Sequence, residues 1–256
     1  MTDLAAITDR LGLRLSPDAL SALLTHATKT KLSPLQIVEA IADAERRERE
    51  ARNLARRQKN ATVGSVKALD RFDWNHPRGI DRDLYEQLHG SLDFVRRGEN
   101  VLLRGQAGVG KTTLAQHLAL RALEQGMTVL FATLSSVLAD LMRQESIPAT
   151  ERRMRRYVNA DLLVLDELGY VPCDARSADL LFHIVSRRHE KRSIVVTTNL
   201  AYKQWTTVFR DATCLGALID RFAQHCHRLD IDADSWRNTD AEKLARPKKP
   251  APRATR

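Results

Sequence analysis

The residues with the clearest chemical signature follow the pattern G-x-x-x-x-G-K-[ST] between positions 105 and 112. An apolar run precedes them and a helical pattern follows. Glycines let backbone N–H groups turn inward around phosphates, and the positive end of the next helix faces those phosphates. Lys111 would reach the β- and γ-phosphates, and the Thr112 hydroxyl would ligate Mg²⁺. This register with a strand and a helix favours a nucleoside triphosphate site over an incidental glycine-rich turn. The residues predicted to contact the nucleotide here are Gly105, Gln106, Ala107, Gly108, Val109, Gly110, Lys111, Thr112 and Thr113.

Two carboxylates, Asp166 and Glu167, directly follow a second apolar run at 162–165. After a phosphate-binding loop, the first carboxylate of such a pair holds Mg²⁺ directly or through water. The second acid can polarise the attacking water as a general base. Taken alone, an Asp-Glu pair after a strand is often only a turn. Its position downstream of the loop favours a catalytic interpretation.

A third apolar run, at 194–196, ends in Thr197-Thr198-Asn199. A polar side chain at the carboxyl end of the strand between the two motif strands can hydrogen-bond the γ-phosphate or its water. Asn199 also fits a cap for a helix beginning near Tyr202. The two roles are compatible.

Apolar runs and helical patterns alternate from residue 100 to 231, which is typical of a parallel sheet covered on both faces. Strands are predicted at 100–103, 128–132, 161–165, 193–197 and 226–231. Helices are predicted at 81–97, 111–124, 135–143, 177–189 and 213–224. The predicted fold class is α/β with a five-stranded parallel sheet, within a domain spanning residues 81–240.

Residues 1–60 are predicted to form a small helical module. Ser16-Pro17 and Ser33-Pro34 each combine a cap with a first-turn residue, and apolar residues follow at helical spacing. Between Glu45 and Lys59, seven basic residues stand against three glutamates. This run fits a solvated helix face with i,i+4 pairs and a phosphate-contacting surface equally well. Residues 61–80 are predicted as a connector, and 244–256 as a basic, disordered tail.

Composition narrows the class of protein. The chain has 256 residues, with 41 basic and 32 acidic side chains and a net charge of +9, which favours an anionic partner such as nucleic acid. No apolar stretch approaches a membrane span, the first residues contain no signal-peptide core, and three cysteines are too few for a disulfide framework. A cytoplasmic location is therefore predicted. His225-Cys226-His227 is interpreted as structural, because alternation on a strand would point neighbouring side chains to opposite faces.

Several of these stretches resemble the IstB-like AAA+ ATPases, helper proteins of one class of insertion sequences that are related to the DnaC and DnaI helicase loaders. The likeness covers nearly everything from about residue 10 to Arg237. In the phosphate-binding loop, Gln106-Ala107 replaces the usual Pro-Pro, and neither side chain carries the chemistry. The most discriminating stretch is Asp-Glu-Leu-Gly-Tyr at 166–170. The others are Gly-x-x-Gly-Val-Gly-Lys-Thr, the Leu-Leu-Phe…Ser-Arg-Arg-His helix, Thr-Thr-Asn-Leu, the Asp-Arg-Phe helix, Ser-Trp-Arg, and the upstream stretches 69–74 and 97–101.

The resemblance implies a P-loop AAA+ core without the typical C-terminal lid, ATP and Mg²⁺ as cofactors, and a homo-oligomer with ATP at subunit interfaces. It also implies assembly on duplex DNA and recruitment of a partner transposase. Residue roles carry over by position. Lys111 and Thr112 would be the Walker A lysine and magnesium ligand, Asp166 and Glu167 the Walker B pair, Asn199 sensor 1, Arg221 an arginine finger acting in trans, and Arg237 a sensor 2 arginine. Physical reasoning alone does not select Arg221 or Arg237 among the 41 basic residues.

An arginine-rich segment lies between the second helix of the α/β body and the strand that ends in Asp166. In an AAA+ ring this insertion faces the central channel, so it either contacts duplex phosphates or forms a solvated helix face. Its arginines are Arg143, Arg152, Arg153, Arg155 and Arg156.

The function expected from these features is an ATP-dependent DNA-binding AAA+ ATPase that assists or regulates a partner transposase. A DnaC-type helicase loader is the nearest alternative, although the basic stretches lack the aromatic platform that single strands favour. A small-molecule kinase fits the Asp166-Glu167 pair and Asn199 poorly. Only measured turnover separates the ATPase from an ATP-gated scaffold that does not hydrolyse ATP.

Overall fold

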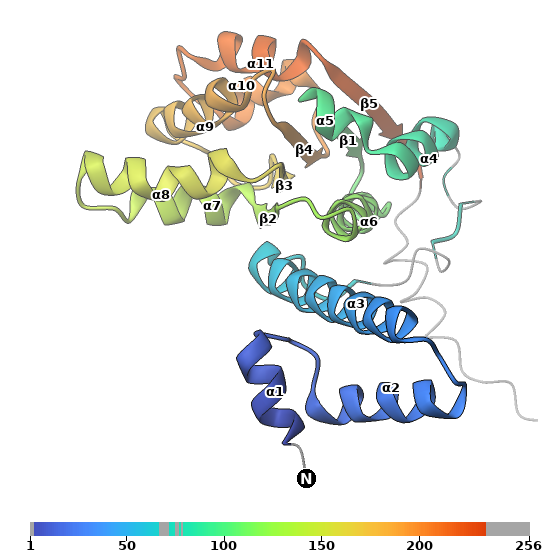
Figure 1. Ribbon diagram of the computed structural model, residues 1–256. Coiled ribbons are helices and arrows are strands. Elements are labelled where there is room, and N and C mark those ends of the chain that lie inside the picture. Colours follow the sequence, from blue (N-terminus) through green and yellow to red (C-terminus); the bar gives the residue numbers. More distant parts are fainter. Residues whose placement is uncertain (1–2, 67–71, 75–76, 78, 234–256) are drawn as a thin grey trace, which may run out of the picture. The chain divides into compact units, whose positions relative to one another are not determined.

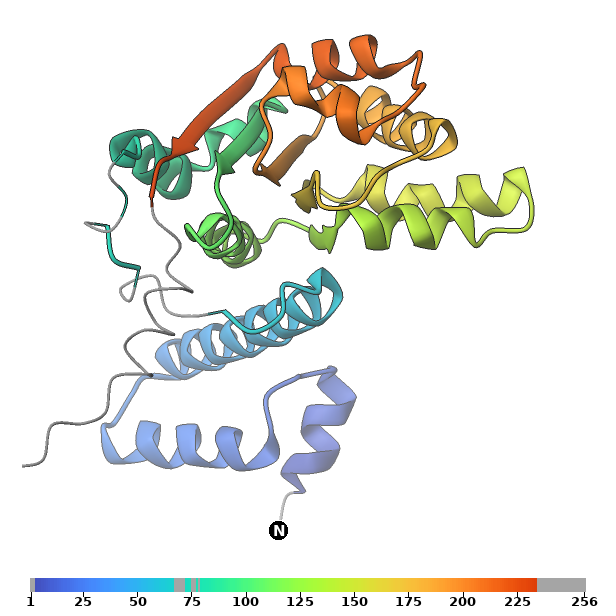
Figure 2. The ribbon, with the colours of Figure 1, turned by 180° about the vertical axis from the view of Figure 1, so that it is seen from behind.

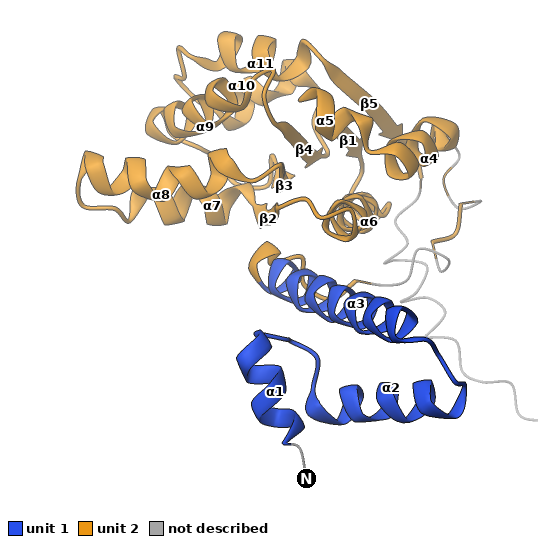
Figure 3. Ribbon diagram, viewed as in Figure 1, with its two compact units in different colours: residues 1–59 blue, residues 60–256 orange. Residues whose placement is uncertain are grey.

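Residues 3–66, 72–74, 77 and 79–233 are described by the computed structural model. The chain divides into two compact units, Met1–Lys59 and Asn60–Arg256 (Figure 3). Arg237, the basic tail 244–256 and part of the expected connector (67–71, 75–76 and 78) lie outside the described residues, as does the region where a C-terminal lid would follow. Within the described part of the chain, none of the helices is both long enough and apolar enough to cross a membrane.

Unit 1 contains three helices whose starts follow from their caps (Figure 1). These are α1 (Leu4–Leu11), α2 (Pro17–Lys29) and α3 (Pro34–Ala61), whose last residues belong to unit 2. The Ser16 hydroxyl accepts the N–H of Ala19, and proline occupies the first turn of α2. At the start of α3, Gln36 accepts the N–H of Ser33 at 2.8 Å, and the Ser33 hydroxyl accepts the N–H of Gln36 at 3.3 Å. Both Ser-Pro pairs therefore begin helices.

Glu45 joins α3 to the connection between α1 and α2. Its carboxylate accepts the backbone N–H groups of Arg14 at 2.8 Å and Leu15 at 2.9 Å, and it pairs with the Arg49 guanidinium. Burial raises the pKa of Glu45, but the hydrogen bond from Arg49 and the two backbone N–H groups outweigh burial and lower that pKa to about 2. The connection is thus held by a carboxylate that is ionised at neutral pH.

Unit 2 is built on a five-stranded parallel sheet in the order β2-β3-β4-β1-β5 (Figures 1 and 2). The central strands are apolar at successive positions because helices cover both faces. The predicted α/β fold is confirmed. The strands are β1 (Asn100–Gly105), β2 (Val129–Thr133), β3 (Leu162–Leu168), β4 (Ser193–Thr198) and β5 (Cys226–Ile231).

Helices divide between the two faces of the sheet. On one side α6 (Lys111–Glu124) packs across the strands. The opposite face and its helices form one continuous core, to which Leu163 and Leu165 of β3 contribute, whereas Leu162 and Val164 do not. This alternation is the period-2 pattern of a strand buried on both faces. The helices of that core are α7 (Leu134–Met142), α8 (Ile147–Asn159), α9 (Ala175–Arg188), α10 (Trp205–Val208) and α11 (Leu215–Ala223).

The helix predicted over 81–97 is wrong as a single element. It breaks at Leu92 into α4 (Arg82–Ser91) and α5 (Asp93–Arg97). Leu92 is fully buried with a φ of 53°, a left-handed conformation that costs a non-glycine residue roughly 1–2 kcal/mol. Burial of this side chain overrides the local helical preference. The helix expected near Tyr202 starts as a 3₁₀ turn, η2 (Tyr202–Gln204), which leads into α10.

Replacement of Glu45 tests the connection in unit 1. Because its folded-state pKa of about 2 lies below the ordinary value of 4.5, the stability that Glu45 contributes is complete above pH 4.5 and is lost as pH falls toward 2. We expect Glu45→Gln to increase amide hydrogen exchange at Arg14 and Leu15 at neutral pH, with a difference from wild type that shrinks through this pH window. Hydrogen–deuterium exchange followed by mass spectrometry of unit 1 peptides measures this difference in exchange.

Glu39→Gln is the matched control, because Glu39 is an exposed carboxylate on the same helix. Equal protection of Arg14 and Leu15 in Glu45→Gln and wild type at neutral pH would contradict the role of this carboxylate.

Candidate functional site

The glycine-rich run connects the last residue of β1 to the first residue of α6. Gly110 has a φ of 93°, in the left-handed region that favours glycine. At Gly105 a Cβ would lie 2.4 Å from the backbone oxygen of Ile231, because β1 runs directly beside β5. Glycine is therefore required at both ends of the loop. Gly110 is required for its backbone conformation, and Gly105 is required for close packing against β5.

Lys111 lies at the loop, in the first turn of α6. Its Nζ donates to the backbone oxygens of Gly105 at 2.8 Å and Gln106 at 2.6 Å, and the residue is largely buried. The ammonium is thus held among the loop carbonyls. Of the other loop residues, Gln106 and Ala107 are exposed, Gly108 is half-buried and Val109 is buried, while Thr113 is half-buried in α6.

Thr112 and Asp166 come together from α6 and β3. The Thr112 hydroxyl lies 3.1 Å from each carboxylate oxygen of Asp166, which is buried. A hydroxyl and a carboxylate are hard oxygen ligands of the kind that Mg²⁺ prefers, and Mg²⁺ usually takes only one or two protein ligands. These two residues therefore fit a magnesium site that nucleotide phosphates complete.

Thr197, which the sequence interpretation did not single out, links both acids. Its hydroxyl donates to Asp166 and accepts the backbone N–H of Glu167 at 3.0 Å. The side chain is 1% exposed. Thr197 can reach both residues because β4 lies between β3 and β1. The signal in the sequence was a hydroxyl directly after the apolar run 194–196 of a buried strand.

Glu167 occupies a strained position at a bulge. The pairing of β3 with β4 shifts between Leu165 and Leu168, and Glu167 has a φ of 63°. A left-handed backbone at a non-glycine residue costs of the order of 1–3 kcal/mol and is typical of functional sites. Asp166 is buried whereas Glu167 is exposed. The bulge therefore gives two adjacent carboxylates different environments.

Asn199 follows the end of β4, between the strands that carry the loop and the acids. It is exposed, and its Oδ1 would lie 3.1 Å from a Cβ added at Gly169. Gly169 follows the acid pair and has a φ of 106°. Asn199 thus lies beside the segment that leaves the acid pair.

Arg221 is held by a ring rather than by an acid. Its guanidinium lies 4.7 Å from the centre of the Phe182 ring, which belongs to α9. Its Nη1 is buried and has no hydrogen-bond partner among the described residues. The contact described for Arg221 therefore comes from α9.

The arginines of the predicted DNA segment differ in their environment. Arg152, Arg155 and Arg156 are exposed on α8, and Arg143 is exposed at the end of α7. Arg153 instead donates from Nε to Asp140 at 2.6 Å, and Tyr157 donates to the same carboxylate.

Asp140 is a good partner for these donors. Burial raises its pKa, but the hydrogen bonds from Arg153 and Tyr157 outweigh burial and lower the pKa. Arg153 is thus engaged within the chain, which the sequence pattern did not reveal.

Phe72 of the expected connector packs against the loop. A Cβ at Gly110 would lie 2.5 Å from the Phe72 ring, and that ring makes an edge contact with Trp74 at 4.8 Å between centres. Trp74 in turn lies 5.4 Å from the Tyr85 ring of α4. The described part of the connector therefore covers one side of the phosphate-binding loop.

The His225–His227 segment shows no metal geometry. His227 Nε2 lies 2.7 Å from a Glu99 oxygen, and Cys226 Sγ lies 3.7 Å from the Tyr202 hydroxyl. In the residues that the structure describes, no group of three or more His, Cys, Asp or Glu side chains is placed to hold a metal ion.

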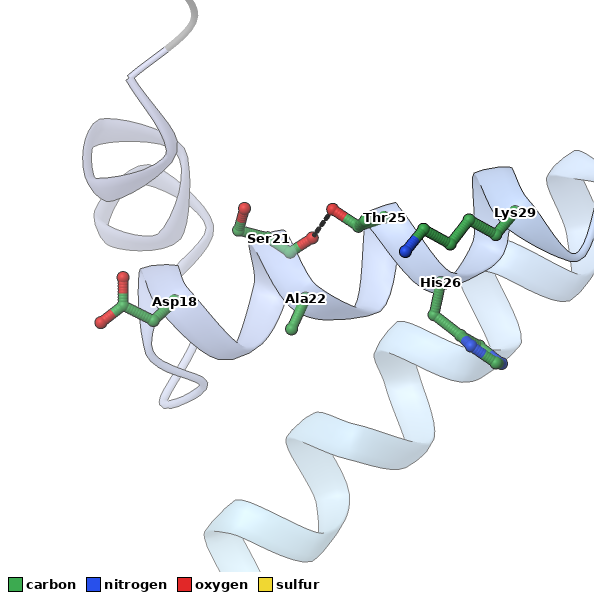
Figure 4. A pocket seen from close by; sticks show the side chains of 6 residues that line it. All are labelled: Asp18, Ser21, Ala22, Thr25, His26 and Lys29. Carbon is green, nitrogen blue, oxygen red and sulfur yellow. Dashed lines mark hydrogen bonds between the residues drawn. The ribbon is translucent and has the colours of Figure 1, made fainter.

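A hollow on unit 1 is lined by one helix only. Thr25 donates to the backbone oxygen of Ser21 at 2.9 Å within it (Figure 4). Because α2 supplies the whole lining, the hollow brings no distant residues together. The lining residues are Asp18, Ser21, Ala22, Thr25, His26 and Lys29.

The strand order β2-β3-β4-β1-β5, with a phosphate-binding loop after β1 and paired acids on β3, defines a P-loop protein with an AAA+-like fold. Solved structures share this fold at 18% sequence identity. A crystal structure of DnaI has a TM-score of 0.52 and covers 68% of this chain and 90% of that chain. A DnaC helicase loader has a TM-score of 0.50, with 68% and 97% covered.

The chain belongs to the family described as IstB-like ATP binding protein, whose model matches residues 6–244. A Pseudomonas aeruginosa protein named as an ATP-binding protein of insertion sequence IS21 is 35% identical over 237 residues, covering 93% of this chain and 89% of that protein. Its counterpart from IS5376 of Geobacillus stearothermophilus is 28% identical over 228 residues, covering 89% and 90%. The resemblance noted in the sequence is confirmed.

Proposed function

We propose that this protein is a Mg²⁺-dependent ATPase that assembles on duplex DNA in the cytoplasm and assists a partner transposase. The observation that carries the ATPase is the set of hydrogen bonds joining Thr112, Asp166, Thr197 and Glu167 beside the phosphate-binding loop. Family membership and relatives named for insertion sequences support the role in transposition.

Each site residue has a chemical task in this proposal. Lys111 and the N–H groups of the loop bind the phosphates at the start of α6. Thr112 and Asp166 would hold Mg²⁺, which neutralises charge on the β- and γ-phosphates. Glu167 accepts a proton from a water that attacks the γ-phosphorus, so that the bond to the β-phosphate oxygen breaks and ADP and phosphate leave. Asn199 orients that water or the γ-phosphate.

Two further arginines are proposed to act on ATP. Arg221, on the amphipathic helix α11, would act in trans on the ATP of an adjoining subunit, which makes hydrolysis depend on assembly. Stacking on Phe182 holds its guanidinium without neutralising the charge. Arg237 keeps its proposed role as sensor 2 and lies outside the described residues.

Exposed arginines on α8 support DNA binding. Arg152, Arg155 and Arg156 are exposed along one helix, so their charges are open to phosphates. A helicase loader is the second candidate, supported by the fold likeness to DnaI and DnaC. The two candidates differ in which DNA the protein should bind more tightly when ATP is present. A transposition helper should prefer the duplex, and a helicase loader should prefer the single strand.

The first test compares duplex and single-stranded DNA of equal length, with and without Mg-ATP. We expect tight binding of the duplex that requires ATP, because nucleotide between subunits organises the assembly. Fluorescence anisotropy at fixed salt measures both affinities. A preference for single strands would favour the helicase loader as the function. Equal duplex affinity with and without ATP would contradict ATP-dependent assembly.

Thr197 should act as a positioning residue for the acids. Thr197→Val removes the hydroxyl that binds Asp166 and Glu167, so we expect kcat for ATP to fall about tenfold to hundredfold, the effect typical of groups that orient metal ligands. Thr197→Ser keeps the hydroxyl and should retain most of the turnover. Phosphate release under saturating Mg-ATP measures kcat.

Glu167→Gln is the reference variant, expected to bind ATP normally but to lose turnover. Equal kcat values for Thr197→Val and Thr197→Ser, with both proteins folded, would show that the hydroxyl does not position the acids.

The α8 surface has its own test in the salt dependence of DNA affinity. Combined Ala substitution of Arg152, Arg155 and Arg156 should weaken duplex binding for all sequences. It should also reduce the magnitude of the negative slope of log affinity against log salt by about 2–3. Arg153→Ala should change the slope less, because Asp140 already engages that charge. An unchanged slope in the triple variant would contradict DNA contact by the α8 arginines. The control is a triple Ala variant of Arg176, Lys191 and Arg210, which removes the same charge from exposed positions outside α8 and should leave the slope unchanged.

A further inference from the structure

A second hollow on unit 1 gathers basic side chains from segments far apart in the sequence. Its volume is about 440 Å³. Residues at the end of α1 and in the connection to α2 face residues from the middle of α3, and no acidic residue lines it. The lining residues are Gly12, Arg14, Arg49, Arg52 and Asn53.

Two of the arginines are fixed in place before any ligand arrives. Arg49 pairs through Nε with Glu45, and its Nη2 donates to the backbone oxygen of Gly12 at 3.2 Å. Arg52 donates from Nε to Glu48 at 2.6 Å and from Nη2 to the backbone oxygen of Arg14 at 2.9 Å. A guanidinium has five N–H donors, and these contacts use two on each arginine.

The carboxylates bind the inner, Nε side of each guanidinium, whereas both arginine side chains are more than half exposed. The remaining donors are therefore available to a ligand in the hollow. Arg14 adds a third, exposed guanidinium, and Gly12 adds no side chain that would fill the space. Planar guanidinium groups with paired N–H donors match the oxygens of a phosphate group.

We infer that this hollow binds a phosphate group, and that the phosphate belongs to the backbone of DNA. The exposed position of the hollow, and the exposed Arg56 and Lys59 that follow Arg52 along α3, suit an extended polyanion. The hollow's residues are different from the α8 arginines. The assignment of this phosphate to DNA rests on the DNA binding proposed above. The inference that the hollow binds a phosphate group does not.

Arg14→Gln is the sharpest variant, because only the backbone of Arg14 participates in the contacts with Glu45 and Arg52. We expect duplex affinity to fall roughly three- to tenfold. The magnitude of the negative slope of log affinity against log salt should decrease by about 1. Arg14→Lys should restore most of the slope, because the charge returns. ATP turnover without DNA should stay unchanged.

The matched control is Arg46→Gln, which removes the same charge from an exposed arginine of unit 1 that pairs with Asp43 and Glu50 outside the hollow. A second measurement titrates wild type and Arg14→Gln with inorganic phosphate and follows the backbone amide resonances of Gly12 and Arg14. This measurement is independent of any DNA binding.

A loss of DNA affinity in Arg14→Gln but not in Arg46→Gln supports the site and its DNA source. Phosphate shifts that vanish in Arg14→Gln, with unchanged DNA affinity, keep the phosphate site and overturn DNA as its source. No change in either measurement overturns the inference. If wild type binds no duplex at all, the proposed DNA function fails, and the phosphate titration still decides the site.

Discussion

The contact on which the nucleotide site depends is the buried hydrogen bond from Thr197 to Asp166. It joins β4 to β3, and the bond from Thr112 to the same carboxylate extends the connection to α6. Leaving a buried carboxylate without donors is costly, so these hydroxyls favour one arrangement of the three elements. The loop, the acid pair and the strand that precedes Asn199 are therefore held in a common register before any ligand binds.

This register depends on the strand order. A parallel sheet places all carboxyl ends at one edge, and β4 between β1 and β3 brings Thr197 within reach of both acids. The bulge at Glu167 follows from the same constraint. An unbroken strand would pair Glu167 regularly with β4, whereas the bulge leaves Asp166 buried in the network and Glu167 exposed. The strain is located where the proposed ATPase mechanism uses two different carboxylates.

Local patterns were sufficient for the loop, the parallel sheet and the Ser-Pro helix starts, because each depends on residues close in sequence. They were insufficient where distant residues decide. Leu92 breaks a helix because its side chain is buried in the folded unit. Arg153 looks like its neighbours in the sequence, but Asp140 pairs with it across the α7–α8 hairpin. Thr197 gains its position only when β3 and β4 align.

Charge counts alone misjudge both basic surfaces. On α8 and on α3, glutamates or aspartates accompany the arginines, which would suggest cancellation. Geometry changes that conclusion. Asp140 binds Nε of Arg153 in a partly buried pair and shares its carboxylate with Tyr157. Arg49 and Arg52, bound at Nε by Glu45 and Glu48, also donate to backbone oxygens at the hollow and stay more than half exposed. An acid at Nε can thus withdraw an arginine from binding or prepare it for binding, and the exposure and the remaining contacts of the guanidinium decide which.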